Sequence, residues 1–397
     1  MYNSAALQIR VLAQGKMYRI TNLVAGRACA GAIVRAVLIP LLAVFTAIVV
    51  GSVFMLLNDY DPLAAYGGLL DGALGSKRAI ARTILNSVPF VFGGLSVAFA
   101  FKGGLFNIGG EGQLFVGAVA AAWIGVAAVG LPAWLHILTS LFAGFLAGSI
   151  WGGIPGTLKA VTGAHEVITT IMFNFIGIVF AGWLVSKGGE GQKPGPLVDP
   201  DPMNIVPRTA EIAESARLPF LEWGREPMHL GILLAIVAVI VIWWVIWKTP
   251  FGFGLRMVGL NPSAARYAGV NVARSTIVTM AIAGGLAGMA GTVETLGRNY
   301  YFAPNFNVGY GFDSIAIALL GRNHPVGVVL SALLFGVMDA GSTRMQLSAH
   351  VPSEIIKVVQ ALILAFVAAN EIIRYIYRIR SAREGDVVPL SAGWGKR

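Results

Sequence analysis

The chain has 397 residues, of which 56% are hydrophobic and only 12% are charged, against roughly 25% charged residues in a typical soluble domain. This composition excludes an ordinary soluble protein and indicates an integral membrane protein. The net charge of +10 raises the question of a nucleic-acid partner. We expect none, because no zinc-binding spacing, RNP-like motif or basic stripe with interleaved aromatic residues is present.

The two ends of the chain carry much of the positive charge. Residues 1–35 form a basic segment without an acidic residue, and residues 371–397 form a second arginine-rich tail. Because cytoplasmic flanks of membrane proteins are enriched in lysine and arginine, both termini are predicted to be cytoplasmic. The single cysteine, Cys29, excludes an internal disulfide framework.

Apolar runs cover residues 36–370 almost without interruption and predict one all-α membrane domain. A membrane span needs about 20 apolar residues, and this length predicts about ten helices. They cover residues 36–57, 83–101, 105–129, 133–158, 167–186, 229–247, 276–293, 308–321, 326–343 and 355–369. The eighth is predicted as a half-helix preceded by irregular chain, which is tolerated in a membrane only against protein or a water-filled cavity.

The order of these helices predicts the side on which each long loop lies. The proline-rich, acidic loop 187–228 falls outside, in the periplasm, and the basic loop 248–275 falls inside. This arrangement agrees with the distribution of positive charge. The first apolar run is too long for a signal-peptide core and is expected to remain as a helix.

The stretch from Phe101 to Gly117, FKGGLFNIGGEGQLFVG, places a carboxylate and two amides among glycines at membrane depth. Ionisable groups are rare there and usually face a cavity or a transport pathway. We expect the glycines and Glu111 to shape a broken third helix, with Glu111 capping it or pairing with a neighbour. Asn107 and Gln113 are the better candidates to meet an uncharged ligand.

Small and charged residues in other helices are expected to serve structure. Glycines spaced four apart in the fourth helix, Gly144, Gly148, Gly152 and Gly156, predict a close packing seam, as do Gly284 and Gly288. Glu166, Asp313 and Arg322 are expected to form structural pairs, and Asp339 is expected to face the interior.

Motifs for catalysis and nucleotide binding are missing from the sequence. GIPGTLK and GALGSK have the wrong residue order for a phosphate-binding loop, the five histidines are scattered, and no nucleophile elbow is present. We therefore expect no enzyme activity, no metal and no cofactor in this chain.

The inside loop 248–275 contains capping signals for a small surface helix. Asn261 and Pro262 suit the start of a helix, and Gly269 follows its expected end after Ser263–Tyr267. A basic, capped element between two turns suits docking to another subunit, and a plain connecting loop is the alternative.

Four strings in this order, FNIGGEGQLFVGA, EVITTIMFNFI, LRMVGLNPSAARYAGVNVARS and GYGFDSIAIALLGRNHPVG, resemble permease subunits of bacterial ABC importers. The resemblance is to the branched-chain amino-acid and simple-sugar superfamily, and most of all to nucleoside or simple-sugar permeases. It implies a bacterial inner-membrane permease of ten helices. The implied partners are a second related permease, ABC subunits that bind ATP and Mg, and a periplasmic or lipoprotein substrate-binding protein.

The resemblance also implies the positions of two functional regions. The element that couples the permease to the ATPase maps to Gly259, Asn261, Ala264, Ala265, Arg266 and Tyr267. Since nucleosides need an apolar cavity with amides and stacking rings, the pathway candidates are Asn107, Glu111, Gln113, Phe106, Phe173 and Asn174. For Asn107 and Asn174 an interhelical hydrogen bond is the alternative.

Three kinds of alternative function can be compared with the sequence. Within the same class, the chain could be a branched-chain amino-acid or ribose permease. A stand-alone, ion-coupled secondary transporter is the alternative from another class, with Glu111, Asp313 and Asp339 as a proton path. A membrane scaffold fits poorly with ionisable residues inside the membrane.

Overall fold

The computed structural model describes residues 38–189, 193–223, 226–304, 309–352 and 354–378. The predicted basic segment 1–35 and most of the predicted tail 371–397 lie outside these residues. The helices are Leu38–Leu56, α2 (Pro62–Leu74), α3 (Lys77–Lys102), α4 (Gly110–Ala127), α5 (Ala133–Thr162), α6 (Glu166–Leu184), α7 (Gly231–Lys248), α8 (Pro250–Leu260), α9 (Pro262–Tyr267), α10 (Val272–Glu294), α11 (Tyr310–Leu320), α12 (Pro325–Ala349), α13 (Glu354–Ala368) and α14 (Asn370–Ile376).

The all-α membrane fold predicted from the sequence is confirmed. Within the described residues, eight helices are long and apolar enough to cross a membrane. The shorter α11 and α13 occupy the positions of the eighth and tenth predicted helices. The exceptions to helix are short: a one-turn 3₁₀ helix at Glu214–Ala216 and an antiparallel pair of strands, β1 (Phe220–Trp223) and β2 (Glu226–His229).

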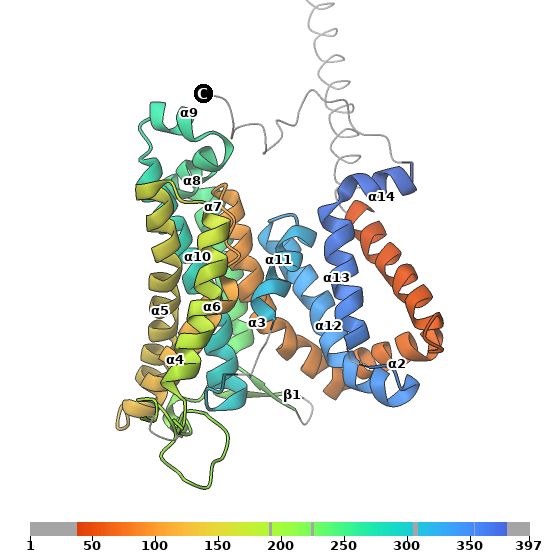
Figure 1. Ribbon diagram of the computed structural model, residues 1–397, viewed down its shortest axis with the longest axis horizontal. Coiled ribbons are helices and arrows are strands. Elements are labelled where there is room, and N and C mark those ends of the chain that lie inside the picture. The colour runs from red at the N-terminus through yellow and green to blue at the C-terminus, as the bar shows by residue number, and fades with distance from the viewer. Residues whose placement is uncertain (1–37, 190–192, 224–225, 305–308, 353, 379–397) are drawn as a thin grey trace, which may run out of the picture.

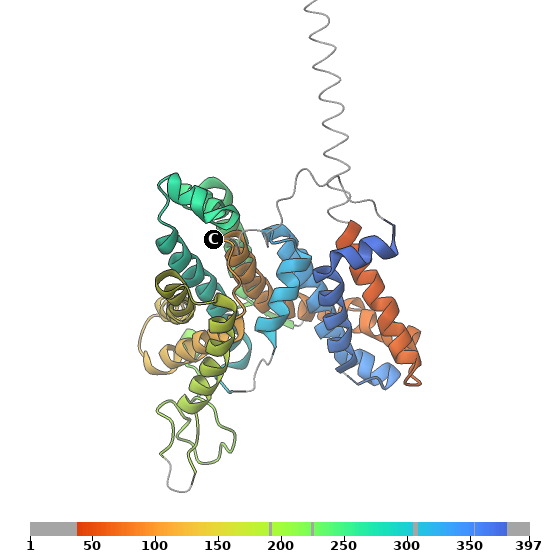
Figure 2. The ribbon, with the colours of Figure 1, turned by 45° about the horizontal axis from the view of Figure 1, so that its top comes forward.

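The helices form two groups (Figure 1). One group contains α4 to α10, and the other contains the helix Leu38–Leu56 with α2, α12, α13 and α14. Helix α3 lies between the groups, because it packs on both α10 and α12, and α11 packs on α3. The two groups remain distinct when the molecule is turned (Figure 2). Helices α8 and α9 lie at one end of the molecule, and β1 lies at the opposite end.

The first group is held together by the predicted glycine seam, which is confirmed. Gly148 and Gly152 of α5 lie directly against Gly284 and Gly288 of α10, with backbone against backbone. Small residues at these positions let the two helix axes approach closely, so that dispersion contacts between the backbones replace side-chain packing. The seam fixes α10 at the centre of this group.

The third predicted helix is shorter than expected and is not broken. Residues 105–109 are non-helical, and α4 begins only at Gly110. The preceding turn contains Gly104 in the left-handed region at φ +72°, where its Cα lies against the backbone of Gly259. A side chain at Gly104 would be strained and would collide with Gly259. This contact turns the chain away from α3 before the next helix can start.

Three helices were not predicted, α2, α8 and α14, and α14 lies at the start of the predicted tail. Helix α2 starts at an Asp61–Pro62 cap, where the Asp61 carboxylate accepts N–H groups of Leu63 and Ala64. Helix α8 occupies the segment before the small surface helix, where we expected one of two flanking turns. Gly252 instead lets α8 lie directly on the last carbonyls of α7, since a larger residue would overlap them. The small helix predicted at Ser263–Tyr267 is confirmed as α9.

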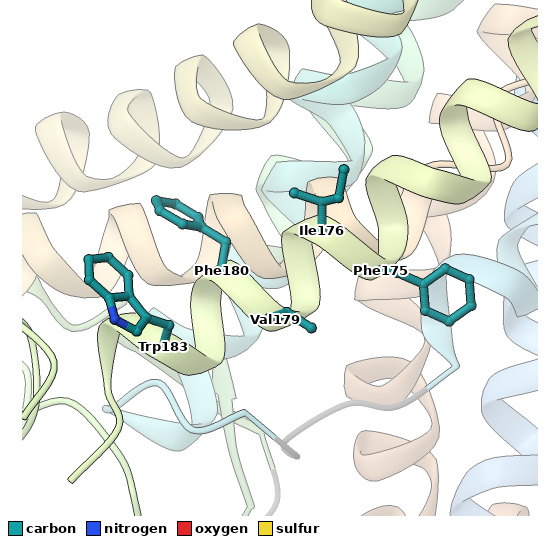
Figure 3. Close-up of a pocket in the computed structure, with 5 residues that line it drawn as sticks. All are labelled: Phe175, Ile176, Val179, Phe180 and Trp183. Atoms are coloured by element: carbon teal, nitrogen blue, oxygen red, sulfur yellow. The ribbon is translucent and has the colours of Figure 1, made fainter. Parts of the chain in front are cut away.

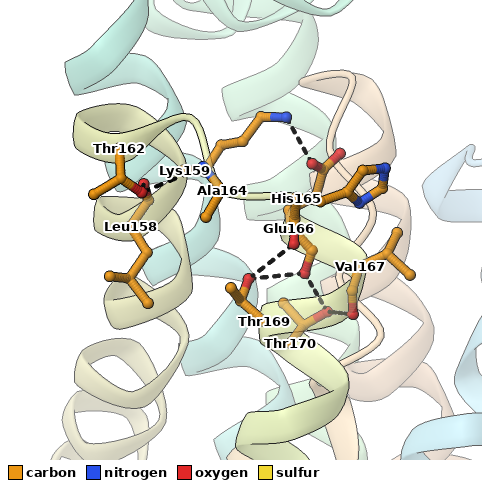
Figure 4. Close-up of polar contacts among 9 residues, drawn as sticks. All are labelled: Leu158, Lys159, Thr162, Ala164, His165, Glu166, Val167, Thr169 and Thr170. Carbon is orange, nitrogen blue, oxygen red and sulfur yellow. Dashed lines mark hydrogen bonds and ion pairs between the residues drawn. The ribbon is translucent and has the colours of Figure 1, made fainter.

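The turn between α5 and α6 contains the predicted pairing of Glu166. The Lys159 ammonium lies 2.7 Å from the Glu166 carboxylate, and the hydroxyl groups of Thr169 and Thr170 donate to the Glu166 carbonyl (Figure 4). The pairing expected for Asp313 and Arg322 is not found, because neither forms an ion pair within the described residues.

Candidate transport pathway and docking element

Glu111 joins the starts of two helices at the centre of the fold. It lies in the first turn of α4, and its two carboxylate oxygens accept N–H groups of Gly309 (2.7 Å) and Gly311 (2.6 Å) at the start of α11. A negative charge is favourable at the N-terminus of a helix, where N–H groups have no partner within the helix. Glu111 therefore caps α11, a helix almost 200 residues away in sequence, rather than its own helix.

Gly311 is required for this arrangement. Its Cα packs against the backbone of Gly110 and Glu111, so any side chain there would overlap the start of α4. The two N-termini consequently meet without an intervening side chain, and the Glu111 carboxylate compensates the dipole of α11.

Asn107 and Gln113 bind each other through two reciprocal amide hydrogen bonds, each 2.9 Å long. Asn107 also donates to the Ser96 hydroxyl of α3 at 3.2 Å, and its Oδ1 accepts the Gly109 N–H. Both amides are buried. These contacts hold the non-helical segment 105–109 between α3 and α4, and a direct contact of either amide with a substrate remains a prediction.

Asn174 of α6 clamps the same segment from the opposite side. Its Oδ1 accepts the Gly112 N–H at 2.8 Å, and its Nδ2 donates to the Ile108 carbonyl at 2.7 Å. This is the kind of interhelical hydrogen bond that the sequence left open as an alternative. Of the predicted rings, Phe106 is 48% exposed and packs edge-on against Phe101, while Phe173 packs on Trp151.

A second polar network, which the sequence did not predict as a unit, links α3, α10 and α12. Arg298 donates to the Glu294 carboxylate and to the side-chain oxygen Oδ1 of Asn86, each at 3.2 Å. The Asn86 amide in turn donates to Asp339 at 2.7 Å. Glu294 is buried, but the Arg298 side chain is 49% exposed, so the network extends from the core to an accessible surface.

The backbone around Arg298 departs from regular helix. α10 continues without a break into a π-helical turn, η2 (Thr295–Asn299), and such turns occur often at functional sites. Our predicted helix ended at residue 293, one residue before Glu294. One sequence feature could have indicated this network. Glu294 and Arg298 are four residues apart, and the stretch between Arg274 and Glu294 contains no other charged residue.

The outward side of α6 is apolar. Phe175, Ile176, Val179, Phe180 and Trp183 line a shallow hollow on it (Figure 3). Phe180 and Trp183 project to one side of the helix and Phe175 to the other. Apolar side chains on a membrane span need no protein partner, because lipid chains solvate them.

The predicted coupling residues fall into two sets. Asn261, Ala264, Arg266 and Tyr267 are exposed on α9 or at its start, and Tyr267 is 96% exposed. Ala265 is instead buried, and Gly259 packs against the end of α3. The Asn261 carboxamide oxygen caps α9 by accepting N–H groups of Ser263 and Ala264.

Within the described residues, no group of three or more histidine, cysteine, aspartate and glutamate residues could hold a metal ion.

These features define a multi-pass membrane transport protein. It has many apolar spans, a half-helix whose start is capped at the core, and an exposed element at one end. The chain belongs to the family described as "Branched-chain amino acid transport system / permease component", whose model matches residues 79–368.

Three relatives cover nearly the whole chain. The guanosine ABC transporter permease protein NupP of Bacillus subtilis is 41% identical over 85% of this chain and 95% of its own length. The nucleoside ABC transporter permease protein NupB of Lactococcus lactis is 36% identical over 85% and 92%. The glucose ABC transporter permease protein TsgB13 of Haloferax volcanii is 33% identical over 90% and 93%.

The first two species each contain a second, more distant relative that is also named as a permease of this kind. NupQ of Bacillus subtilis is 24% identical over 65% of this chain and 79% of its own length, and NupC of Lactococcus lactis is 26% identical over 66% and 80%. No solved structure matches the chain.

Proposed function

We propose that this chain is the permease subunit of an ATP-driven importer of nucleosides. The observation that carries the proposal is the 41% and 36% identity to permeases for guanosine and nucleosides over 85% of the chain. Transport here is a conformational process, without a covalent step in this chain.

The exposed helix α9 suits docking to a partner subunit that hydrolyses ATP. Its Tyr267 and Arg266 project at one end of the molecule, where exposed aromatic and arginine side chains commonly contribute most to protein interfaces. We place this end and both termini in the cytoplasm of a bacterial inner membrane. ATP and Mg would bind to separate subunits that dock on α9, and a second permease related to this chain would complete the pathway.

Charge reversal at the docking helix gives a direct test. Arg266→Glu should weaken co-purification with the ATP-binding subunits at least tenfold, which corresponds to about 1.4 kcal/mol, because the side chain is exposed on the docking helix. Lys77→Glu, at the opposite end of the molecule, is the control and should leave co-purification unchanged. Unchanged co-purification and ATPase stimulation in Arg266→Glu would remove α9 as the docking element.

The network around Arg298 suits one wall of a polar transport pathway, in the half of the molecule that lies away from α9. Asn86, Arg298 and Asp339 come from three helices and offer donors and acceptors that suit the hydroxyl groups of a ribose. Hydrogen bonds to charged groups contribute about 1.5–3 kcal/mol, so one such contact can change an apparent affinity tenfold or more. Glu111 keeps α11 attached to α4 while the two helix groups move.

Asp339→Asn tests this wall. The variant keeps an oxygen that can accept from Asn86 but removes the carboxylate charge, and we expect the KM for nucleoside uptake to rise about tenfold. Asp71→Asn is the matched control, because Asp71 forms an exposed ion pair with Arg344 at 3.1 Å, and such pairs contribute little to stability. Equal KM values in the two variants would exclude Asp339 from the pathway.

A simple sugar is the second candidate substrate, since a glucose permease is 33% identical over 90% of the chain. Competition in cells that express the complete assembly separates the two. Excess unlabelled guanosine should suppress uptake of labelled nucleoside, while glucose, ribose and leucine should not. Suppression by glucose alone would assign a sugar, and suppression by leucine would contradict both substrates.

A further inference from the structure

Helix α7 ends in a group of tryptophans that marks a membrane boundary. Trp243, Trp244 and Trp247 fall within five residues, directly before Lys248 at the end of the helix, and the first two are exposed. Tryptophan side chains concentrate where the hydrocarbon core meets the lipid headgroups. This end of α7 therefore lies at headgroup depth, on a surface that faces lipid.

Two cations from separate elements converge on Trp247. The Arg256 guanidinium carbon of α8 lies 4.6 Å from the centre of the indole ring, and the Lys102 ammonium at the end of α3 lies 5.6 Å from it. Lys102 is also within electrostatic range of Arg256 and Arg322. The fold enforces this proximity, because Gly259 of α8 packs on the Lys102 carbonyl.

The positive charge of this group has no carboxylate partner within the described residues. None of the ion pairs found there includes Lys102, Arg256 or Arg322. Lys102 and Arg256 are both half-buried. The group thus presents two half-buried cations that stack on the ring of Trp247.

We propose that Lys102 and Arg256, positioned on the ring of Trp247, bind the phosphate of an anionic phospholipid headgroup. A phosphodiester supplies a negative charge and enough oxygen atoms for both an arginine and a lysine. Basic pockets between membrane helices are suited to such headgroups. The tryptophan group places the cations at the required depth, whereas α9 lies beyond α8 at the same end of the molecule (Figure 1).

The experiment measures lipid binding to the purified full-length protein by native mass spectrometry and thermal shift. The probes are phosphatidylglycerol, phosphatidylcholine with the same acyl chains, and inorganic phosphate. Phosphatidylglycerol should bind and stabilise the protein. Lys102→Gln should weaken its binding about fivefold and the double variant with Arg256→Gln about thirtyfold, from the usual contribution of one basic side chain at an anionic surface.

Two controls separate a binding defect from a folding defect. Lys77→Gln neutralises a lysine at the other end of α3 and should bind phosphatidylglycerol as the wild type does. The double variant Lys102→Arg with Arg256→Lys keeps both charges and should keep most of the binding.

Four outcomes would overturn the proposal in whole or in part. Equal binding of phosphatidylcholine, or unchanged binding by the Gln double variant, would remove the site. Full competition by inorganic phosphate would show that the site binds a phosphate group but does not require a lipid. Loss of the ATP-binding subunits from the Gln double variant, with lipid binding intact, would assign the cations to a protein partner instead.

Discussion

Gly148→Ala should weaken the packing of the two central helices of the first group and lower the stability of the protein. A methyl group on Gly148 would overlap the Gly284 carbonyl oxygen and lie 2.9 Å from the Gly288 Cα, and no flexible side chain is present to yield. Overpacking typically costs about 1–3 kcal/mol, and Gly148→Leu should abolish accumulation of the protein. The measurement is the midpoint of thermal unfolding followed by size-exclusion chromatography in detergent.

Gly153→Ala on the same helix is the matched control. Its added methyl group would meet only the Ala281 Cβ at 3.7 Å, an ordinary contact. Glycine in a helix is about 0.5–1 kcal/mol less favourable than alanine, so this variant should be as stable as the wild type or more stable. If both variants unfolded at the same temperature, the seam would not be the element that holds α5 to α10.

Glu111→Ala should have the second large effect. The substitution leaves the N–H groups of Gly309 and Gly311 without their acceptor, and each buried donor left unpaired costs about 1–3 kcal/mol. We expect a destabilisation of about 2–6 kcal/mol from the same principle, together with loss of uptake. Release of α11 should also expose the segment 300–304 to protease in the folded membrane protein.

Glu111→Gln and Glu211→Gln complete this test. Gln at position 111 keeps one acceptor oxygen and loses the charge, so its stability should fall between those of the wild type and Glu111→Ala. Glu211 forms an exposed pair with Arg217 at 2.8 Å, and such pairs contribute about 0–1 kcal/mol. A wild-type melting temperature for Glu111→Ala would show that the carboxylate does not hold the two helices together.

Features set by neighbours in sequence were predictable. The glycines of α5 are four residues apart, so their common face follows from helix geometry alone. The start of α9 follows from the capping chemistry of Asn261 and Pro262. The identity of the membrane helices follows from the length of each apolar run.

Features set by distant parts of the chain were not predictable. The acceptor role of Glu111 requires Gly309 and Gly311, and Asn86 and Asp339 are 253 positions apart. No local pattern carries such pairings. Helix α8 was missed for a related reason: we expected a turn there, but its glycines serve close packing on α7.

The pathway residues show the same division. The sequence located the polar stretch at Asn107, Glu111 and Gln113, and the structure brings it together with Asn174 of α6. The amides engage one another so fully that their contact with substrate needs a rearrangement. The accessible Arg298 lies on a π-helical turn that follows a buried glutamate, a geometry that composition does not reveal.

ATP-dependent uptake is the most direct test of the central claim. Proteoliposomes that contain this chain, its second permease, the ATP-binding subunits and the substrate-binding protein should accumulate labelled guanosine only with hydrolysable ATP on the side of α9. This chain reconstituted alone should show no uptake under a proton or sodium gradient. Gradient-driven uptake by the chain alone, without ATP or partners, would contradict the proposed importer and assign a secondary transporter.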